Sequence, residues 1–190
     1  MFAPVPLPGD PSPAPPPSRP TFESVYAEGF THVWHTLRRF GVADADLEDA
    51  AHEVFVVVHR RLDTYQPERP LRPWLSGIAF RVASDERRRL RLRPETLSTD
   101  GDLETRASGA PGPEEQLSQA QQRAFVLRAL DALTLDRRSV FVMSELDEIS
   151  GPDIAEALAL PLNTVYSRLR LARQDFAEAV RRLRAREVVE

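Results

Sequence analysis

The chain has 190 residues, of which 42% are hydrophobic, and it contains no cysteine. The lack of cysteine excludes a disulfide scaffold, a thiolate zinc site and a cysteine nucleophile. The net charge is −4 and all 25 basic residues are arginine, so bulk positive charge does not drive nucleic-acid binding. No apolar run approaches the roughly 20 residues of a membrane span, and the N-terminus lacks the segments of a signal peptide. We therefore expect a soluble cytoplasmic protein without membrane insertion.

Residues 1–20 contain nine prolines, a composition that predicts an extended, disordered arm. The alternative use of this arm is as a proline-rich ligand for a partner protein. From residue 21 the pattern changes to apolar residues at helical spacing. The first predicted helix covers Thr21–Phe40, and Gly41 ends it.

A second predicted helix follows Asp46, which we expect to cap it, with Asp49 at the capping-box position. Three prolines then mark a loop at residues 63–73, and Pro73 suits the first turn of a third helix. No segment shows the alternating pattern of a strand. We therefore predict a small all-helical domain over residues 21–93.

Residues 94–112 are rich in Gly, Pro, Ser, Thr and Asp, which indicates a flexible linker. The stretch 94–122 holds one arginine against six acidic residues, so most of the net negative charge lies there. A second helical domain is predicted over residues 113–190. It opens with a helix from Pro113, in which apolar residues recur at helical spacing from Leu117 to Leu133.

Three further elements of the second domain predict a helix-turn-helix. A short helix is expected at Leu135–Leu146. The next begins after Ser150, an N-cap with Asp153 three residues on. A tight turn at Ala159–Pro161 then leads to a long helix, Leu162–Arg184.

The outward face of this last helix carries side chains that suit a DNA major groove: Asn163, Thr164, Tyr166, Ser167, Arg168, Arg170 and Arg173. Arginine reaches guanine edges or phosphates, asparagine reaches adenine, and hydroxyls reach either. The alternative is a solvated amphipathic helix, but the capped helix and the tight turn before it favour DNA binding.

Two groups in the first domain also carry candidate contacts. The run from Arg81 to Arg93 has a net charge of +4 over 13 residues, which suits either a phosphate-binding face or a solvated one. The non-core face of the second helix carries a candidate protein-docking surface: Asp49, His52, Glu53 and Val56. Zinc binding on this face is not expected, because no second histidine lies four residues after His52 and the chain has no cysteine. Because no phosphate-binding loop or catalytic motif appears, we predict no catalytic residues, no metal and no cofactor.

Two groups of segments resemble the extracytoplasmic-function (ECF) sigma factors of bacterial RNA polymerase. The segments that resemble their conserved region 2 are Asp49–Phe55, Trp74–Leu75, Ile78–Ala79, and Asp85 with Arg87–Arg88. Their region 4 resembles Leu130–Leu133, Arg138–Phe141, Asp153–Ala155 and Leu158–Arg173. Together the two regions cover about residues 21–93 and 113–184, in the order found in that family.

The resemblance implies a sigma factor that is not itself an enzyme. It implies docking of Asp49, His52, Glu53 and Val56 on the β′ clamp helices of core polymerase, and of the second domain on the β flap. It implies that a base flipped out of the −10 element is captured by residues of the loop and third helix: Thr64, Tyr65, Arg81, Ser84 and Arg88. The last helix would read the −35 element, the acidic linker would pass toward the RNA exit path, and an anti-sigma factor would regulate the protein.

The chain departs from the family pattern at several positions. His52 stands where the family usually has Gln, and Arg81 stands where it often has Asn. Arginine is common at the positions of Tyr166 and Leu171, and glycine at those of Ala159 and Asn163. The promoter sequence therefore does not carry over. The alternatives are a stand-alone helix-turn-helix regulator, which would not need the docking face, and a helical metal enzyme.

Overall fold

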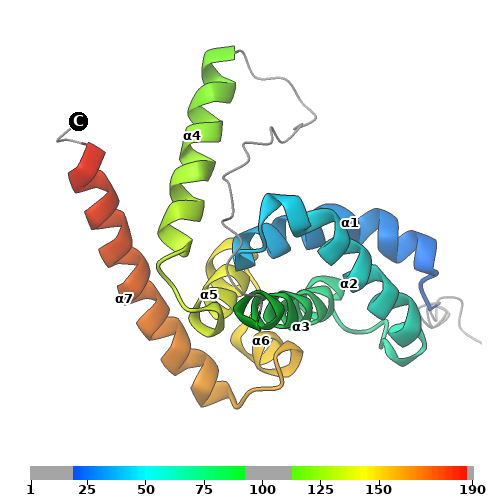
Figure 1. Ribbon diagram of the computed structural model, residues 1–190. Helices are drawn as coiled ribbons and strands as arrows, with labels where there is room; N and C mark the ends of the chain where they lie inside the picture. The colour runs from blue at the N-terminus through cyan, green and yellow to red at the C-terminus, as the bar shows by residue number, and fades with distance from the viewer. Residues whose placement is uncertain (1–18, 93–112, 188–190) are drawn as a thin grey trace, which may run out of the picture.

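A computed structural model describes residues 19–92 and 113–187, which are helical apart from their turns. Residues 1–18 of the proline-rich arm and the linker at 94–112 lie outside the described residues. The helices are α1 (Phe22–Phe40), α2 (Leu47–Arg61), α3 (Leu71–Leu92), α4 (Pro113–Leu130), α5 (Leu135–Phe141), α6 (Gly151–Ala157) and α7 (Leu162–Glu187). A π-helical turn, η3 (Val142–Leu146), extends α5, and no strand occurs in the described part of the chain (Figure 1). The all-α prediction is confirmed.

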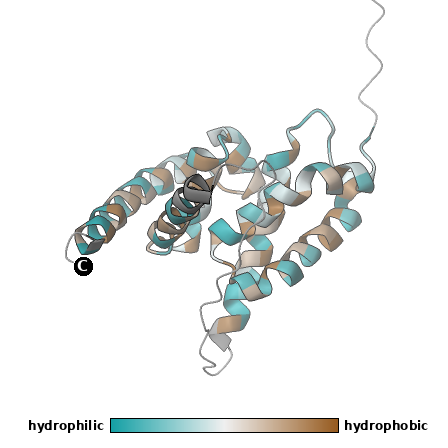
Figure 2. Cartoon of the chain, turned by 90° about the horizontal axis from the view of Figure 1, so that it is seen from above, coloured by the Kyte–Doolittle hydropathy of each residue, from teal (hydrophilic) through white to brown (hydrophobic). Residues whose placement is uncertain are grey.

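Helices α1, α2 and α3 pack together as the first module. The Thr21 hydroxyl accepts a hydrogen bond from the backbone N–H of Ser24 and caps α1. Gly41 ends α1 with φ of 91°, a left-handed conformation that glycine adopts without strain. Leu37 and Leu75 are fully buried between the helices. Each helix therefore turns an apolar face inward. In Figure 2, hydrophobic and hydrophilic residues alternate along the ribbons of the helices.

The predicted capping box at the start of α2 is wrong. A 3₁₀ turn, Asp44–Asp46, runs directly into α2, so Asp46 has helical backbone angles and its side chain makes no capping hydrogen bond. An N-cap needs an extended backbone to aim its side chain back at the first turn. The inward stripe of α2, from Leu47 to Val58, is buried as its spacing predicts.

The stripe predicted for α4 is correct only in its last turn. Ala120 and Ala124 are exposed and Leu127 is half-buried, whereas Leu130 and Leu133 are buried. Figure 1 shows α4 projecting from the rest of the molecule beside α7, so that much of its length has no helix to pack against. Alanine and leucine favour a helix through propensity alone, which makes spacing a weak indicator of burial here.

The helix-turn-helix is confirmed as α6, a turn and α7. The Ser150 hydroxyl accepts from the Asp153 backbone N–H and donates to the Asp153 carboxylate at 2.6 Å. Ala159 holds the turn with φ of 54°, a left-handed angle that explains why glycine suits this position. Val165 and Ala172 of α7 are fully buried.

The two modules are not separated in this structure. Helix α3 contacts α6, and α1 contacts α5 and η3. One continuous apolar core includes residues of both modules, such as Leu37 and Leu75 in the first and Phe141 and Ile154 in the second. No feature of the sequence predicted this direct interface between the two helical domains.

Candidate functional site

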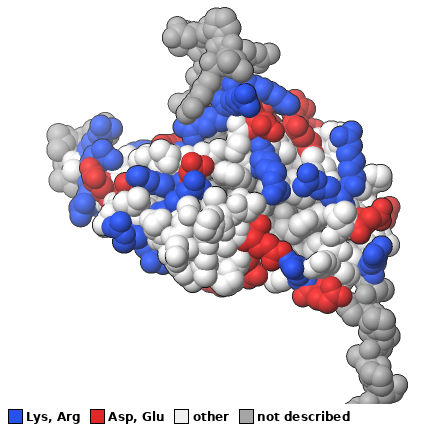
Figure 3. Space-filling view, turned by 90° about the horizontal axis from the view of Figure 1, so that it is seen from below, with Lys and Arg blue, Asp and Glu red and all other residues white. Residues whose placement is uncertain are grey.

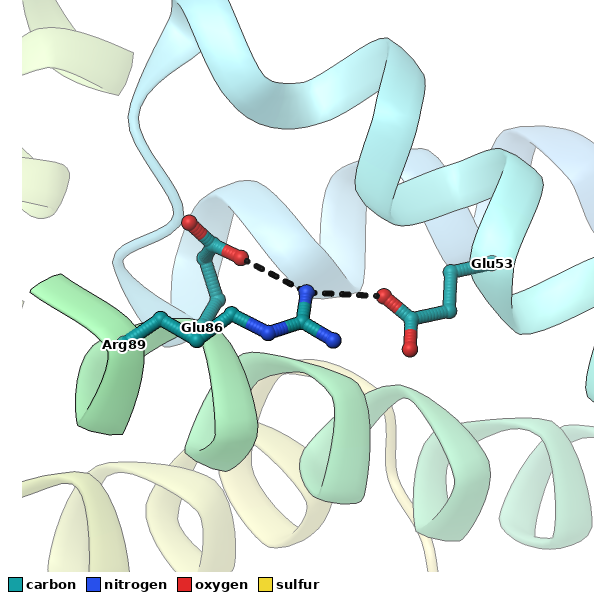
Figure 4. Close-up of polar contacts among 3 residues, drawn as sticks. All are labelled: Glu53, Glu86 and Arg89. Atoms are coloured by element: carbon teal, nitrogen blue, oxygen red, sulfur yellow. Dashed lines mark hydrogen bonds and ion pairs between the residues drawn. The ribbon is translucent and has the colours of Figure 1, made fainter.

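The outer face of α2 is available to a partner. Asp49 and His52 are exposed, and Glu53 and Val56 are half-buried at the surface. Glu53 contacts the guanidinium of Arg89 on α3 at 3.4 Å (Figure 4). This arrangement makes the face acidic and connects it to the neighbouring helix.

Arg89 is a residue of this face that the sequence did not single out. Its Nη1 lies 3.4 Å from both Glu53 and Glu86. In the sequence, Arg89 is one of several arginines in the run from Arg81 to Arg93, and nothing distinguishes it from the others as a candidate for phosphate binding. Its position between two carboxylates instead lets it connect Glu53 of α2 to α3. This role depends on the packing of α2 on α3, so the sequence alone does not show it.

Three of the five residues predicted to contact the −10 element come together at one pocket of about 300 Å³. Thr64 and Arg81 are exposed at its wall. The third, Tyr65, is 8% exposed and its ring lies 4.9 Å from that of Trp74. Its hydroxyl donates to the backbone carbonyl of Arg69 at 2.6 Å. Tyr65 is therefore a rigid wall of the pocket, with an aromatic platform beside it.

The other two predicted −10 residues lie elsewhere on α3. Ser84 is half-buried and its hydroxyl donates to the Phe80 carbonyl at 2.7 Å, so the hydroxyl is engaged within the helix. Arg88 is exposed, and neither residue lines the pocket. Trp74, which was not among the predicted −10 residues, does line the pocket.

The opposite wall of the pocket belongs to α6 of the second module, through Asp153, Glu156 and Ala157. Glu156 forms an ion pair with Arg69. Nη2 of Arg81 donates to the Ala157 carbonyl at 3.4 Å. Sequence spacing gave no indication of these contacts, because their partners are separated by more than 70 positions.

The residues predicted to read a DNA groove lie along the outward face of α7. Asn163, Ser167 and Arg170 are exposed, and Thr164 is half-buried. Tyr166 is 52% exposed. The Tyr166 ring also lies against Gly151, at the start of α6. The face is therefore fixed to α6 at one point and open along the rest.

Two arginines of the α7 face already hold acidic partners. Arg168 lies 3.6 Å from Asp136 of α5, and Arg173 lies 2.7 Å from Glu145 of η3. On the face seen from below, basic and acidic side chains are interspersed (Figure 3). DNA binding by the free chain must therefore compete with these pairs.

Comparison with known proteins decides the family. The sequence matches Sigma-70 region 2 over residues 23–93 and Sigma-70, region 4 over residues 126–176. It is 33% identical over 141 residues to the RNA polymerase sigma factor CnrH of Cupriavidus metallidurans, which covers 72% of this chain and 74% of CnrH. It is 28% identical over 148 residues to the ECF RNA polymerase sigma-E factor of Escherichia coli, which covers 75% of this chain and 78% of that protein. The chain belongs to the ECF group of the sigma-70 family.

A solved structure agrees with the fold of this sigma factor. The sigma factor RpoE of Bartonella quintana, in complex with the anti-sigma factor NepR, superposes with a TM-score of 0.63 at 17% identity. The match covers 84% of this chain and 96% of that one. The protein is thus an alternative sigma factor that directs transcription initiation. In the part of the chain that the structure describes, no helix is long and apolar enough to cross a membrane.

A half-buried histidine gives the sigma factor a pH-dependent stability. Burial, and next the guanidinium of Arg72, lower the pKa of His32 to about 4. The ring Nε2 lies 2.9 Å from the hydroxyl of Ser76 on α3. An unfolded histidine has a pKa near ~6.5, so below that pH the unfolded chain binds the extra proton. Stability is then complete above pH ~6.5 and is lost as the pH falls toward about 4.

We expect the free energy of unfolding to fall by about 1–2 kcal/mol between pH 7.5 and pH 5 from His32 alone, allowing for the solvent that reaches the ring. Urea titrations at the two pH values measure this difference. His32→Gln should remove this share of the pH dependence, and His52→Gln, at an exposed position, should retain it. An unchanged pH dependence in His32→Gln would contradict the assignment.

Proposed function

We propose that this sigma factor docks on core RNA polymerase through the acidic outer face of α2. Support comes from the exposure of Asp49 and His52 and from the surface position of Glu53 and Val56. A stand-alone regulator has no use for such a face. The residues 21–93 then act as the polymerase-docking and −10 module, and residues 113–190 as the −35 module, with the linker at 94–112 between them.

The pocket formed by Thr64, Tyr65, Trp74 and Arg81 is proposed to receive a base flipped from the −10 element. Tyr65 and Trp74 give it an aromatic wall, on which an unstacked base regains about 1–3 kcal/mol. Arg81 supplies a guanidinium at the rim for phosphate or base edges. Ser84 and Arg88, farther along α3, are proposed to contact the flanking backbone rather than the base.

The outward face of α7 is proposed to enter the major groove of the −35 element. Its candidate contacts are Asn163, Thr164, Tyr166, Ser167, Arg168, Arg170 and Arg173. The observation that carries this assignment is the capped α6, the left-handed turn and the polar N-terminal face of α7 in one helix-turn-helix. The second module is further proposed to contact the β flap of the polymerase.

As a transcription initiation factor, the protein is proposed to act without catalysing a reaction itself and to work in the cytoplasm, where the polymerase transcribes the chromosome. An anti-sigma factor is proposed as its negative regulator. Support for this comes from the Bartonella quintana sigma factor, which was solved with the anti-sigma factor NepR.

Transcription in vitro tests the proposed function. Genomic fragments are transcribed with heterologous bacterial core polymerase, with and without the full chain, and the start sites are mapped. We expect a set of start sites that appears only when both proteins are present, preceded by shared −10 and −35 sequences. Sequence-specific DNA binding by the chain alone, with no core-dependent start sites, would favour the stand-alone regulator.

A further inference from the structure

Helix α1 carries four aromatic side chains at spacings of four residues, which places them along one ridge of the helix. Successive ring centroids lie 5.4 to 6.0 Å apart. The buried ring of Phe55 on α2 lies 4.6 to 6.5 Å from the first three of them. We call this surface the aromatic ridge, and its members are Phe22, Tyr26, Phe30 and Trp34.

The aromatic ridge faces solvent and has no role in the functions proposed above. Tyr26 is 43% exposed, and the other three members are half-buried. An exposed apolar patch with polar residues at its rim marks an interaction site. The charged residues of α1 between Phe22 and Phe30 are Glu23 and Glu28, both exposed. Because acidic residues repel a nucleic-acid backbone, the ridge suits an uncharged polypeptide.

The chain itself supplies a segment of that chemistry directly before α1. Residues 1–20 contain nine prolines, and their charged side chains are Asp10 and Arg19 alone. Five of the prolines lie in residues 11–17, where Pro13 and Pro16 have the spacing of a PxxP motif. Such segments favour the polyproline II conformation before they bind, and they dock on aromatic-lined surfaces at a low entropic cost. The arm therefore has the composition of a ligand for the ridge.

Length and position also match. The ridge spans about 18 Å along α1 at 1.5 Å per residue, and residues 11–17 span about 19 Å as polyproline II at 3.1 Å per residue. The ridge begins at Phe22, so residues 18–20 can reverse the chain, and Pro20 is half-buried already. A short tether gives an effective concentration in the millimolar range. A second copy of the chain has no such advantage at ordinary concentrations.

We propose that residues 11–17 dock on the aromatic ridge as an internal ligand, antiparallel to α1. The proline rings pack on the exposed faces of Tyr26 and its neighbours, cover the apolar surface and stabilise the first module. Docking is a property of the free chain and does not depend on the assignments of the polymerase-binding and DNA-binding residues.

Paramagnetic NMR on the full chain tests the docking. Because the chain has no cysteine, Ser12→Cys can carry a single nitroxide within the proline run, and the loss of amide signals reports the surface that it approaches. In one comparison chain the five prolines of residues 11–17 are replaced by serine, which keeps length and charge. In another, Tyr26→Ala removes the most exposed ring of the ridge. The matched control for it is Tyr166→Ala, because Tyr166 is 52% exposed and lies on α7.

We expect the greatest signal loss at Tyr26, at Phe30 and at His59, whose ring lies 5.2 Å from that of Phe22. The loss should fall at least twofold in the serine chain and in Tyr26→Ala, and it should persist in Tyr166→Ala. A loss that decays evenly from Thr21 and is equal with proline and serine would show a tether without docking and overturn the proposal.

Two further outcomes would give the ridge another occupant and also overturn the proposal. The first is signal loss in an isotope-labelled chain when the nitroxide is on a separate chain, which would assign the ridge to a second copy. The second is the absence of signal loss on the ridge together with weaker core binding by Tyr26→Ala, which would assign the ridge to polymerase.

Thermal unfolding of the same chains without nitroxide gives an independent test. Replacing the prolines by serine should lower the midpoint temperature of the unmodified sequence and of Tyr166→Ala equally, and should lower that of Tyr26→Ala less. The arm and Tyr26 contribute to one contact, so their effects are not additive. The effect of proline on the unfolded chain is common to all three backgrounds and cancels. An equal effect of the arm in Tyr26→Ala and Tyr166→Ala would contradict the docking.

Discussion

Replacing Asp49 and Glu53 together with arginine should abolish binding to core polymerase and leave the fold intact. Both side chains lie at the surface of α2, so their replacement leaves the buried stripe from Leu47 to Val58 untouched. The ion pair of Glu53 with Arg89 is 3.4 Å long and largely solvated, and such pairs contribute about 0–1 kcal/mol to stability. An interface built on charge complementarity, in contrast, loses several kcal/mol when like charges are placed against each other.

We therefore expect at least a hundredfold loss of core affinity in the Asp49→Arg, Glu53→Arg double variant. Fluorescence anisotropy of labelled sigma factor titrated with core polymerase measures the affinity, and thermal unfolding checks the fold. Glu68→Arg with Glu178→Arg is the matched control, because it changes the net charge equally at exposed positions away from α2. Equal core affinity of the two double variants would show that polymerase docks elsewhere.

The helices were predictable because their signals are local. Thr21 begins α1, Gly41 ends it and Ser150 begins α6, each through contacts with residues three or four positions away. The error at Asp46 is also local in origin. A side chain that can cap a helix does so only with an extended backbone, and the preceding 3₁₀ turn removes that conformation.

Burial was less predictable than helicity, since it depends on what a face meets. Ala124 has the spacing of a core residue but no neighbour to cover it, and it is exposed. Tyr65 lies in a predicted loop, yet its side chain is buried. Its ring packs against Trp74, and its hydroxyl donates to the Arg69 carbonyl. Burial makes the Tyr65 ring part of the aromatic wall on which a flipped base is proposed to stack.

The interface between the modules had no signal in the sequence. Gly77 lies within a helical pattern, where an isolated glycine only lowers helix propensity. The structure explains why glycine stands at this position, because a side chain there would overlap the Ala157 carbonyl. Similarly, the acidic residues Asp147 and Glu156 have the composition of solvated positions, and each holds an arginine of the other module. Such pairs are specified by tertiary packing, which spacing along one chain does not encode.

Among the arginines of α7, Arg170 should contribute most to reading of the −35 element. It is exposed on the groove-facing surface, and among the described residues no acidic side chain pairs with it. Arg173 contacts Glu145 at 2.7 Å. Breaking this ion pair offsets part of the free energy that Arg173 gains on binding DNA. Arg170 also lies near the N-terminal end of α7, the part of a recognition helix that contacts base edges.

Arg170→Ala should weaken binding of the polymerase holoenzyme to its promoter by about 1–3 kcal/mol, or roughly 5- to 150-fold, if the guanidinium contacts a base edge. Arg170→Lys separates the two kinds of contact, since lysine keeps the charge for a phosphate and loses the bidentate geometry for guanine. A base contact predicts that lysine rescues little and that −35 sequence preference relaxes at one position. A phosphate contact predicts that lysine restores most of the affinity. It also predicts that the alanine variant releases about one fewer counterion on binding, so that the slope of log affinity against log salt concentration falls by about 1. Arg181→Ala, exposed farther along α7, is the control, and an equal effect of both alanine variants would remove Arg170 from the reading surface.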